Sequence, residues 1–244
     1  SASRASARER AAATNPSRRT KCSRRSALAR VARNFYGKPD EVVAVTAFTG
    51  TNGKSTGTMV TDGVLRHTGR RTSLINTIGY HMCGEQRPAV NTTPESLDVY
   101  RMLAETREAG GGYLTMEISS HALALGRVED LRVAVAVFTN LTRDHLDFHG
   151  TMDDYFAAKA RLFGEEFRPG AAVLNADDEW TPRLRVASET WPITYGIRNE
   201  AMLRAVHIES GFFGLRFEIE GLARVRSKLI GEINVYNILA AAGA

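Results

Sequence analysis

The sequence alternates between short apolar runs and longer segments whose apolar residues recur at helical spacing. Short runs rich in Val and Ile predict buried strands, and the periodic segments predict amphipathic helices. The expected strands are residues 42–48, 71–75, 78–82, 113–118, 133–138, 171–174 and 193–195, and the expected helices are residues 54–67, 93–109, 120–125, 151–163 and 178–187. This order predicts an α/β fold: a mostly parallel sheet flanked by helices, with ligands bound at the carboxyl ends of the strands.

The pattern changes after Tyr195. Residues 203–209, 212–219 and 222–227 alternate apolar and polar positions around glycine-containing turns, which predicts a small antiparallel meander near the C-terminus. Residues 234–242 read as a final helix.

The first 25 residues are rich in Ser, Arg and Ala and contain no aromatic or large aliphatic residue. Such a composition predicts a disordered basic tail, because it buries too little apolar surface to offset the entropy of ordering. It also fits an organelle transit peptide, a solvated tail or a mispredicted gene start. Residues 26–40 are expected to form a short helix and a turn that link this tail to a domain of residues 41–244.

The net charge of +5 belongs to the tail, because residues 1–33 carry nine Arg and one Lys against only Glu9. The other 211 residues hold 22 basic and 26 acidic side chains, so the composition does not indicate nucleic-acid binding. The two cysteines, Cys22 and Cys83, lie far apart, which suits a reducing cytoplasm. The sequence has no apolar run of about 18 residues, so we expect no membrane partner.

An apolar run that ends at Phe48 is followed by a glycine-bounded turn and then by Lys-Ser at the start of a predicted helix. This order is typical of a phosphate loop, in which glycines let the backbone approach phosphate and a lysine reaches the β- and γ-phosphates. The general spacing would place a glycine at position 48, and a simple turn before a helix remains open. The expected nucleotide-binding residues are Gly50, Thr51, Asn52, Gly53, Lys54, Ser55 and Thr56.

Three further side chains have chemistry that the residues alone leave open. Glu117 ends a predicted strand, where a carboxylate either binds Mg²⁺ or faces solvent. His145 follows the next strand; because Mg²⁺ prefers oxygen, it is as readily a hydrogen-bonding residue as a ligand. Lys159 lies on an amphipathic helix and reads as a solvated surface lysine.

Six motifs occur in an order that resembles the central ATPase domain of the Mur ligases. Within that family they look like the UDP-N-acetylmuramoyl-tripeptide synthetase branch, and the match covers roughly residues 27–244. The motifs are Thr49–Ser55, Asn91–Glu95, Met116–Leu123, Gly126–Val128, Phe138–Gly150 and Tyr155–Phe163.

The resemblance implies roles that the residues alone do not give. Lys54 and Ser55 match the phosphate-loop lysine and an Mg²⁺-binding hydroxyl, Glu117 and His145 match metal ligands, and Lys159 matches a lysine that is carbamylated in the family. Thr92, Thr93, Ser119 and Arg127 match residues that contact the muramyl-dipeptide substrate, and Asn234 and Asn237 match an asparagine motif near the adenine. Ala47 stands where the family usually has Gly, and Ile230-Gly-Glu-Ile233 replaces the usual Pro-Gly-Arg-Phe.

The implied activity is ATP- and Mg²⁺-dependent amide formation in the cytoplasm. A third amino acid, meso-diaminopimelate or L-lysine, would be joined to UDP-N-acetylmuramoyl-L-alanyl-D-glutamate through an acyl phosphate. The family also has an N-terminal UDP-binding domain and a C-terminal amino-acid-binding domain, which we expect to be absent from these residues, leaving a partial enzyme. A folylpolyglutamate or cyanophycin synthetase and a non-catalytic Mur-ligase-like scaffold are the alternatives.

Overall fold

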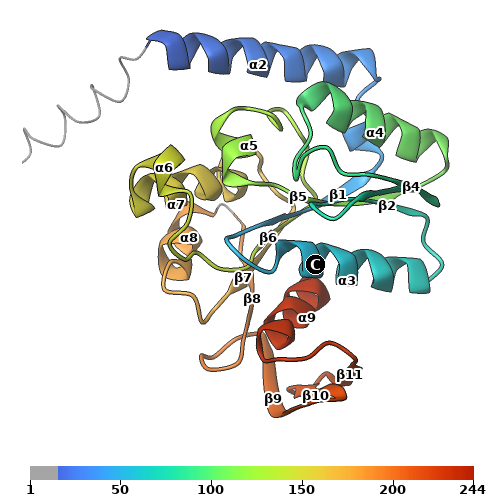
Figure 1. The fold of residues 1–244 in the computed structure, drawn as a ribbon, viewed down its shortest axis with the longest axis vertical. Helices are drawn as coiled ribbons and strands as arrows, with labels where there is room; N and C mark the ends of the chain where they lie inside the picture. Colours follow the sequence, from blue (N-terminus) through green and yellow to red (C-terminus); the bar gives the residue numbers. More distant parts are fainter. Residues whose placement is uncertain (1–15, 189) are drawn as a thin grey trace, which may run out of the picture.

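Strand β1 (Ala44–Thr49) lies at the middle of a sheet, between β5 (Tyr113–Glu117) and β6 (Val135–Phe138), and pairs in parallel with both. The structure is a computed structural model that describes residues 16–188 and 190–244. Figure 1 shows the sheet nearly edge-on, with helices above and below it. The predicted α/β fold is therefore confirmed.

The described residues form an eleven-stranded sheet with the order β11-β10-β9-β8-β7-β6-β1-β5-β2-β3-β4. Its parallel part continues from β1 to β2 on one side and to β9 on the other; these outer parallel strands are β2 (Thr72–Ile75), β7 (Ala171–Asn175), β8 (Ile193–Gly196) and β9 (Leu203–Gly211). Antiparallel strands form both ends of the sheet; they are β3 (Tyr80–Met82), β4 (Glu85–Arg87), β10 (Gly214–Ile219) and β11 (Ala223–Ser227).

The predicted C-terminal meander is confirmed as β9, β10 and β11, but it is not separate from the main sheet. Strand β9 also pairs in parallel with β8, so the meander extends the sheet. Strand β4 was not expected, because its three mostly exposed polar residues carry no apolar signal.

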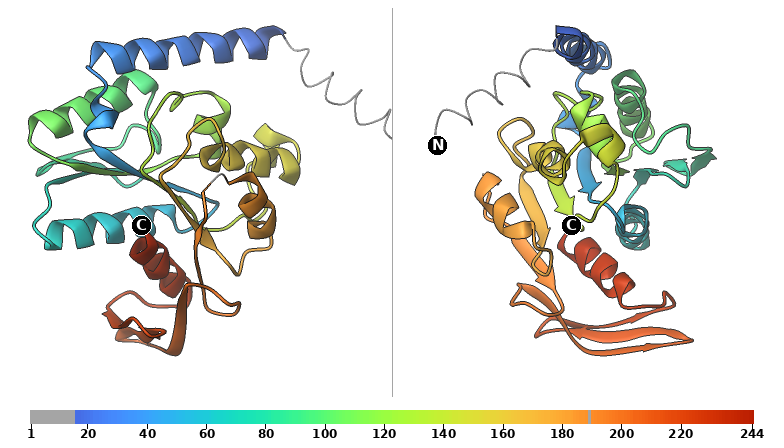
Figure 2. Two further views of the ribbon diagram at one scale, coloured as in Figure 1. Left: turned by 180° about the vertical axis from the view of Figure 1, so that it is seen from behind. Right: turned by 60° about the vertical axis from the view of Figure 1, so that its left-hand side comes forward.

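Helices cover both faces of the sheet (Figures 1 and 2). Helices α3 (Lys54–His67) and α9 (Ile233–Gly243) lie on one face, and α4 (Ser96–Glu108) lies on the other with α2 (Pro16–Phe35) outside it. The remaining helical segments are η1 (Pro39–Glu41), α5 (Ser120–Ala124), α6 (Leu146–His149), α7 (Met152–Ala160), η2 (Arg161–Phe163) and α8 (Thr181–Ala187). The predicted helix over residues 54–67 is confirmed residue for residue.

Strand β1 divides the hydrophobic core into two clusters because successive side chains in a strand point to opposite faces. Val45 and Ala47 join the cluster beneath α4, whereas Phe48 joins the cluster beneath α9. A strand buried on both faces needs a continuous apolar sequence, which is what the sequence pattern showed. Within the described residues, no helix is both long enough and apolar enough to cross a bilayer.

The N-terminal segment differs from the prediction. Residues 16–25, expected to be disordered, are helical and continue into the expected linker as a single helix, α2. Ala29 and Ala32 are 0% exposed and belong to the main core, and the Arg33 guanidinium lies 2.9 Å from the buried Asp40 carboxylate. Small alanines that pack closely against α4 carry no strong hydropathy signal, so the packing was missed. The part of the tail prediction that covers residues 1–15 lies outside the described residues.

We predict that Ala32→Leu destabilises the chain by about 1–3 kcal/mol, because the added carbons have no free volume between α2 and α4. Urea denaturation measures the effect. Val31→Leu, at a position 64% exposed on the same helix, is the matched control and should change stability by less than about 0.5 kcal/mol. Equal effects of the two substitutions would show that α2 is a linker rather than part of the core.

Candidate active site

The predicted site residues gather at the carboxyl edge of the parallel strands. Pairing of Phe48 with Glu117 and of Thr49 with Phe138 brings the ends of β5 and β6 to the two sides of the phosphate loop that follows β1. Strand β2 ends beside β5, with Ile75 paired to Met116. The parallel register therefore assembles segments far apart in the sequence into one site.

Two glycines allow the phosphate loop to approach its neighbours closely. Gly50 has φ 149°, and a Cβ there would lie 1.9 Å from the Thr139 hydroxyl oxygen. Gly53 has φ 87°, and a Cβ there would lie 2.3 Å from Oδ1 of Asn237. Any larger residue would therefore be both strained and in collision at these positions. The loop ends at Lys54, where α3 begins; the unpaired N–H groups of a helix N-terminus favour binding of an anion.

The loop is held by the segment that follows β6. The Thr139 hydroxyl donates to the Asn52 carbonyl at 2.6 Å, and the Asn140 amide donates to the same carbonyl at 3.0 Å. In return, the Asn52 N–H donates to Oδ1 of Asn140 at 2.9 Å, and the Thr51 N–H donates to the Asn140 carbonyl at 2.8 Å. The loop is thus fixed in shape before any ligand binds.

Two lysines converge on one carbonyl of this loop. Nζ of Lys54 donates to the Gly50 carbonyl at 3.0 Å, and Nζ of Lys159 donates to the same oxygen at 2.7 Å. Lys159 is only 2% exposed, and its Nζ lies 4.6 Å from the centre of the Tyr155 ring. The interpretation of Lys159 as a solvated surface lysine was therefore wrong.

Burial changes the protonation of both lysines. Desolvation, followed by repulsion from Lys54, lowers the pKa of Lys159 well below its ordinary value. Desolvation also lowers the pKa of Lys54, although the negative charges of Glu117 and Asp144 oppose that shift. A buried lysine with a lowered pKa has a larger fraction of neutral amine, which is the nucleophilic form.

Glu117 is a buried carboxylate at the end of β5. It is 1% exposed, and both of its oxygens accept from Thr77: Oε1 from the N–H at 3.0 Å and Oε2 from the hydroxyl at 3.2 Å. A carboxylate in this position, beside the phosphate loop, has the chemistry of an Mg²⁺ ligand, as does the hydroxyl of Ser55. Among the described residues, no three His, Cys, Asp or Glu side chains form a ready-made metal cluster. The donor set fits Mg²⁺ only if a hydroxyl, bound phosphate or modified lysine completes it.

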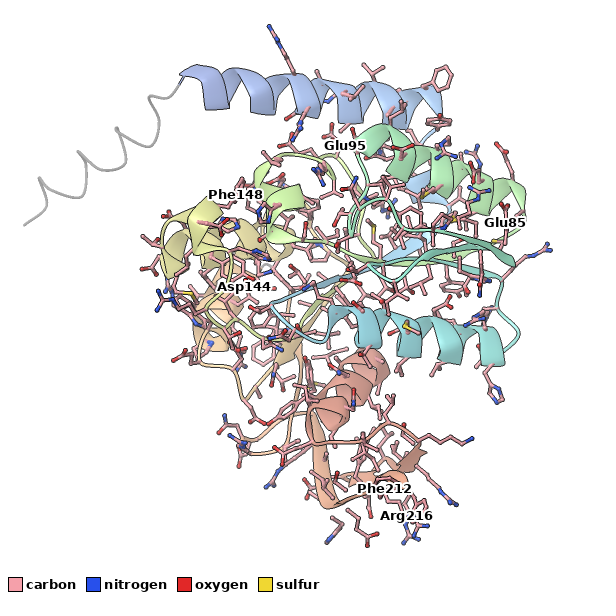
Figure 3. The ribbon with its side chains drawn as sticks, in the orientation of Figure 1. Glu85, Glu95, Asp144, Phe148, Phe212 and Arg216 are labelled. Atoms are coloured by element: carbon pink, nitrogen blue, oxygen red, sulfur yellow. The ribbon has the colours of Figure 1, made fainter. Side chains whose placement is uncertain are left out.

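His145 lies in a cluster of aromatic rings near α6 and α7. It has φ 51°, and its ring centre lies 4.9 Å from that of His121 and 6.1 Å from that of Tyr155. Burial, followed by the charge of His121, lowers the pKa of His149 to about 4, so this neighbouring imidazole is neutral at physiological pH. Figure 3 shows Asp144 and Phe148 around this segment. His145 itself is 48% exposed at its side chain and so accessible to a ligand.

The four residues expected to contact a substrate lie together beside Glu117. The Thr93 hydroxyl donates to the Glu117 carbonyl at 2.9 Å and accepts from the Ser119 N–H at 3.0 Å. Arg127 donates to the Thr93 carbonyl at 3.1 Å and forms an ion pair with Glu95. Thr92 lies 3.0 Å from Thr77, measured between their hydroxyl oxygens.

The asparagine pair lies on the other side of the phosphate loop, on α9. Asn237 is 4% exposed, faces Gly53, and donates from Nδ2 to Oδ1 of Asn234 at 2.9 Å. Asn234 in turn donates to the Ile230 carbonyl at 2.8 Å. The α9 N-terminus is therefore packed directly against the start of α3, next to the phosphate loop.

Sequence reasoning missed Thr77 and Tyr155 as parts of the site. Thr77 follows a short strand and lies outside the six motifs, and Tyr155, although it begins the motif Tyr155–Phe163, was given no role of its own. The available signal for Tyr155 was its position four residues before Lys159, which places both on one face of α7.

The Mur ligase middle domain family matches residues 48–244, and the chain belongs to this family. It is 54% identical over 222 residues to a UDP-N-acetylmuramoyl-L-alanyl-D-glutamate--2,6-diaminopimelate ligase from Solibacter usitatus, covering 89% of this chain and 45% of the relative. A ligase with the same description from Geobacillus kaustophilus is 43% identical over 229 residues, covering 90% of this chain and 47% of the relative. The chain thus spans about half the length of these relatives.

Solved structures have the same fold. A structure with that ligase name superimposes with a TM-score of 0.73 at 29% identity, covering 82% of this chain and 42% of the other. A folylpolyglutamate synthase from Mycobacterium tuberculosis superimposes with a TM-score of 0.68 at 16% identity, covering 89% and 57%. At 16% identity this second likeness shows a shared fold only.

We predict that Lys159→Met stabilises the chain at pH 7 in CO₂-free buffer, by about 1 kcal/mol or more. Between the lowered folded pKa and the ordinary pKa of lysine, the unfolded chain holds a proton that the folded chain has lost. The free energy of unfolding therefore rises with pH across that window, and the substitution removes the rise. Urea denaturation at several pH values measures it. Lys228→Met, at an exposed lysine, is the control. An unchanged pH dependence in Lys159→Met would show that Lys159 is fully charged in the fold.

Proposed function

We propose that this chain is the ATP-binding part of a ligase that joins 2,6-diaminopimelate to UDP-N-acetylmuramoyl-L-alanyl-D-glutamate during peptidoglycan synthesis. The observation that carries the proposal is the convergence of Lys54, Lys159 and Glu117 at one phosphate loop. The names of the relatives support the choice of diaminopimelate over lysine. Because the proposed reaction consumes ATP, we place it in the cytoplasm.

The proposed reaction has two stages. In the first, a carboxylate oxygen of the muramyl dipeptide attacks the γ-phosphorus of ATP; an O–P bond forms, the bond to the β-phosphate oxygen breaks, and ADP leaves. In the second, the amine of the incoming amino acid attacks the acyl phosphate; a C–N bond forms, phosphate leaves, and the nitrogen loses a proton. Catalysis of the first stage depends mainly on positioning and on neutralising phosphate charge.

The phosphate loop supplies both of these effects. It runs from Gly50 to Thr56 and ends in the first turn of α3, where the backbone N–H groups of Lys54, Ser55 and Thr56 would face the phosphates and the Lys54 side chain supplies a positive charge. Asn234 and Asn237, which lie next to Gly53, would bind the adenine. Mg²⁺, when held by Ser55, Glu117, His145 and modified Lys159, would neutralise the charge that develops on the phosphates.

We also propose that Lys159 is carbamylated. Its neutral amine attacks CO₂; a C–N bond forms, and the nitrogen loses a proton to solvent. The product is an anion, which places a negative charge next to the Lys54 side chain at the Gly50 carbonyl. The carbamate also offers two oxygens of the kind that Mg²⁺ prefers.

The muramyl dipeptide would bind on the Glu117 side of the loop. Arg127 offers a guanidinium for a substrate carboxylate, although Glu95 already pairs with it. Figure 3 shows Glu95 at the start of α4, next to the α5 segment that carries Ser119. The proposed site therefore extends from the asparagines on α9, across the phosphate loop, to the substrate-contacting residues Thr92, Thr93, Ser119 and Arg127.

Phosphate release from ATP tests this function. We expect the wild-type chain to release phosphate only when UDP-N-acetylmuramoyl-L-alanyl-D-glutamate is present, and we expect Lys54→Ala to abolish both release and Mg-ATP binding measured by calorimetry. Lys228→Ala should behave as wild type. Unchanged ATP affinity in Lys54→Ala would contradict the phosphate loop, and release stimulated by a folate polyglutamate would favour the alternative substrate class.

Carbamylation is tested separately by ¹³C NMR of the chain in ¹³C-bicarbonate. We expect one carbamate resonance that is lost in Lys159→Ala and retained in Lys228→Ala. Since only the neutral amine reacts, its intensity should rise with pH through the lowered pKa of Lys159. A resonance that persists in Lys159→Ala would assign the modification to another amine.

A further inference from the structure

Thr77 contacts two parts of the site, the Glu117 carboxylate and the Thr92 hydroxyl. Its N–H and hydroxyl donate to the two oxygens of Glu117, at 3.0 and 3.2 Å, and its hydroxyl oxygen also lies 3.0 Å from that of Thr92. Glu117 is the carboxylate that we expect to bind Mg²⁺, and Thr92 is one of the residues that we expect to contact the substrate. A single side chain therefore touches both.

The turn that carries Thr77 is stabilised by hydrogen bonds of Asn76. Asn76 is 1% exposed, and its Oδ1 accepts from the N–H groups of Ile78 and Gly79, both at 3.0 Å. The Asn76 N–H donates back to the Gly79 carbonyl at 3.3 Å. This side-chain-stabilised turn holds the Thr77 hydroxyl at a constant place relative to β5.

The direction of the hydrogen bonds that link Glu117, Thr77 and Thr92 follows from the number of hydroxyl protons available. The Thr77 hydroxyl has a single proton and donates it to Oε2 of Glu117. Thr77 can then only accept from Thr92, so the hydroxyl proton of Thr92 is used within the protein. What Thr92 offers to a ligand is therefore lone pairs and no proton.

The hydroxyl of the neighbouring Thr93 is not available to a ligand in this way. Its side chain is 1% exposed; its hydroxyl proton is donated to the Glu117 carbonyl, and one lone pair accepts from the Ser119 N–H. The Thr93 side chain is thus occupied in fixing the loop, whereas Thr92 is half-buried and open to a ligand.

We propose that Thr77 is a positioning residue that couples Glu117 to the substrate group, and that Thr92 accepts a hydrogen bond from a donor of the substrate. That donor is a peptide amide N–H or a sugar hydroxyl of the muramyl dipeptide, and not its carboxylate. The proposal rests on the proposed function. It makes Mg²⁺ binding at Glu117 and substrate orientation at Thr92 depend on one hydroxyl group.

The first test measures the Mg²⁺ concentration that supports binding of the non-hydrolysable analogue AMP-PCP, by calorimetry. Thr77→Val, which keeps the shape and the N–H, should raise that concentration about tenfold, as expected for loss of a hydrogen bond to a charged group. Thr77→Ser should stay within about twofold. Thr92→Val should also stay within about twofold, because the Thr92 hydroxyl contacts Thr77 and makes no hydrogen bond to Glu117. Circular dichroism checks that each variant is folded.

Two outcomes of this test separate the ideas. If the wild-type chain fails to bind Mg-AMP-PCP, the proposed function is wrong and this inference falls with it. If the wild type binds but Thr77→Val needs no more Mg²⁺, or Thr92→Val needs as much extra as Thr77→Val, only the direction and role of the hydroxyl chain are overturned.

The second test measures the affinity of UDP-N-acetylmuramoyl-L-alanyl-D-glutamate in saturating Mg-AMP-PCP. Thr92→Val should weaken binding at least about fivefold and Thr92→Ser by less than about twofold. Two substrate analogues distinguish the two donors: one is N-methylated at the peptide amide, and the other lacks the sugar hydroxyl. The analogue that lacks the true donor should bind the wild type more weakly than the substrate does, and its affinity should fall no further in Thr92→Val. Coupling of Thr92 instead to a carboxamide analogue of the D-glutamate carboxylate, or failure of the wild type to bind the nucleotide, would overturn the assignment of Thr92.

Discussion

The Gly50 carbonyl is the point on which the rest of the site depends. It is reached by two lysines, one from the start of α3 and one from α7, in a place where water is largely excluded. Two like charges at such a place are unfavourable, and the surrounding structure permits this arrangement only because both amines have lowered pKa values. The fold thus holds two amines close together where water is largely excluded. An anionic ligand, or an anion formed on Lys159, would offset the repulsion between them.

The architecture that creates this point is simple. Parallel strands end at one edge, and the loops after β1, β2, β5 and β6 hold one another through hydrogen bonds between side chains and backbone, such as Thr139 to Asn52 and the Thr77 N–H to Glu117. None of these loops is long enough to fold by itself. Their shapes are set by the register of the strands below, which is why residues 90 positions apart can be placed to within a hydrogen bond.

Features with a local cause could be predicted from the sequence. The helix at Lys54–His67 and the glycines at positions 50 and 53 follow from spacing within a dozen residues, and the strands follow from continuous apolar runs. Lys159 could not be assigned in this way, because its burial depends on α7 packing against a loop more than a hundred residues earlier. The family resemblance supplied that role instead. The packing of α2 through alanines and the contacts of Thr77 were missed for the same reason. Each depends on a partner distant in the sequence, and neither alanine nor threonine is a residue type that indicates such a contact.

The two ends of the sheet have a consequence for how the molecule behaves in crowded solution. Strands β4 and β11 each leave one side of their backbone without a strand partner in the described sheet, and an open edge invites another chain to extend it. Both edges carry exposed charges: Glu85 on β4, and Arg224 and Arg226 on β11. Arg226 also faces Arg216 across the strand pair, so a second copy of β11 brought alongside would add to an existing repulsion. The polar residues that hid β4 from recognition thus protect the molecule from edge-to-edge aggregation.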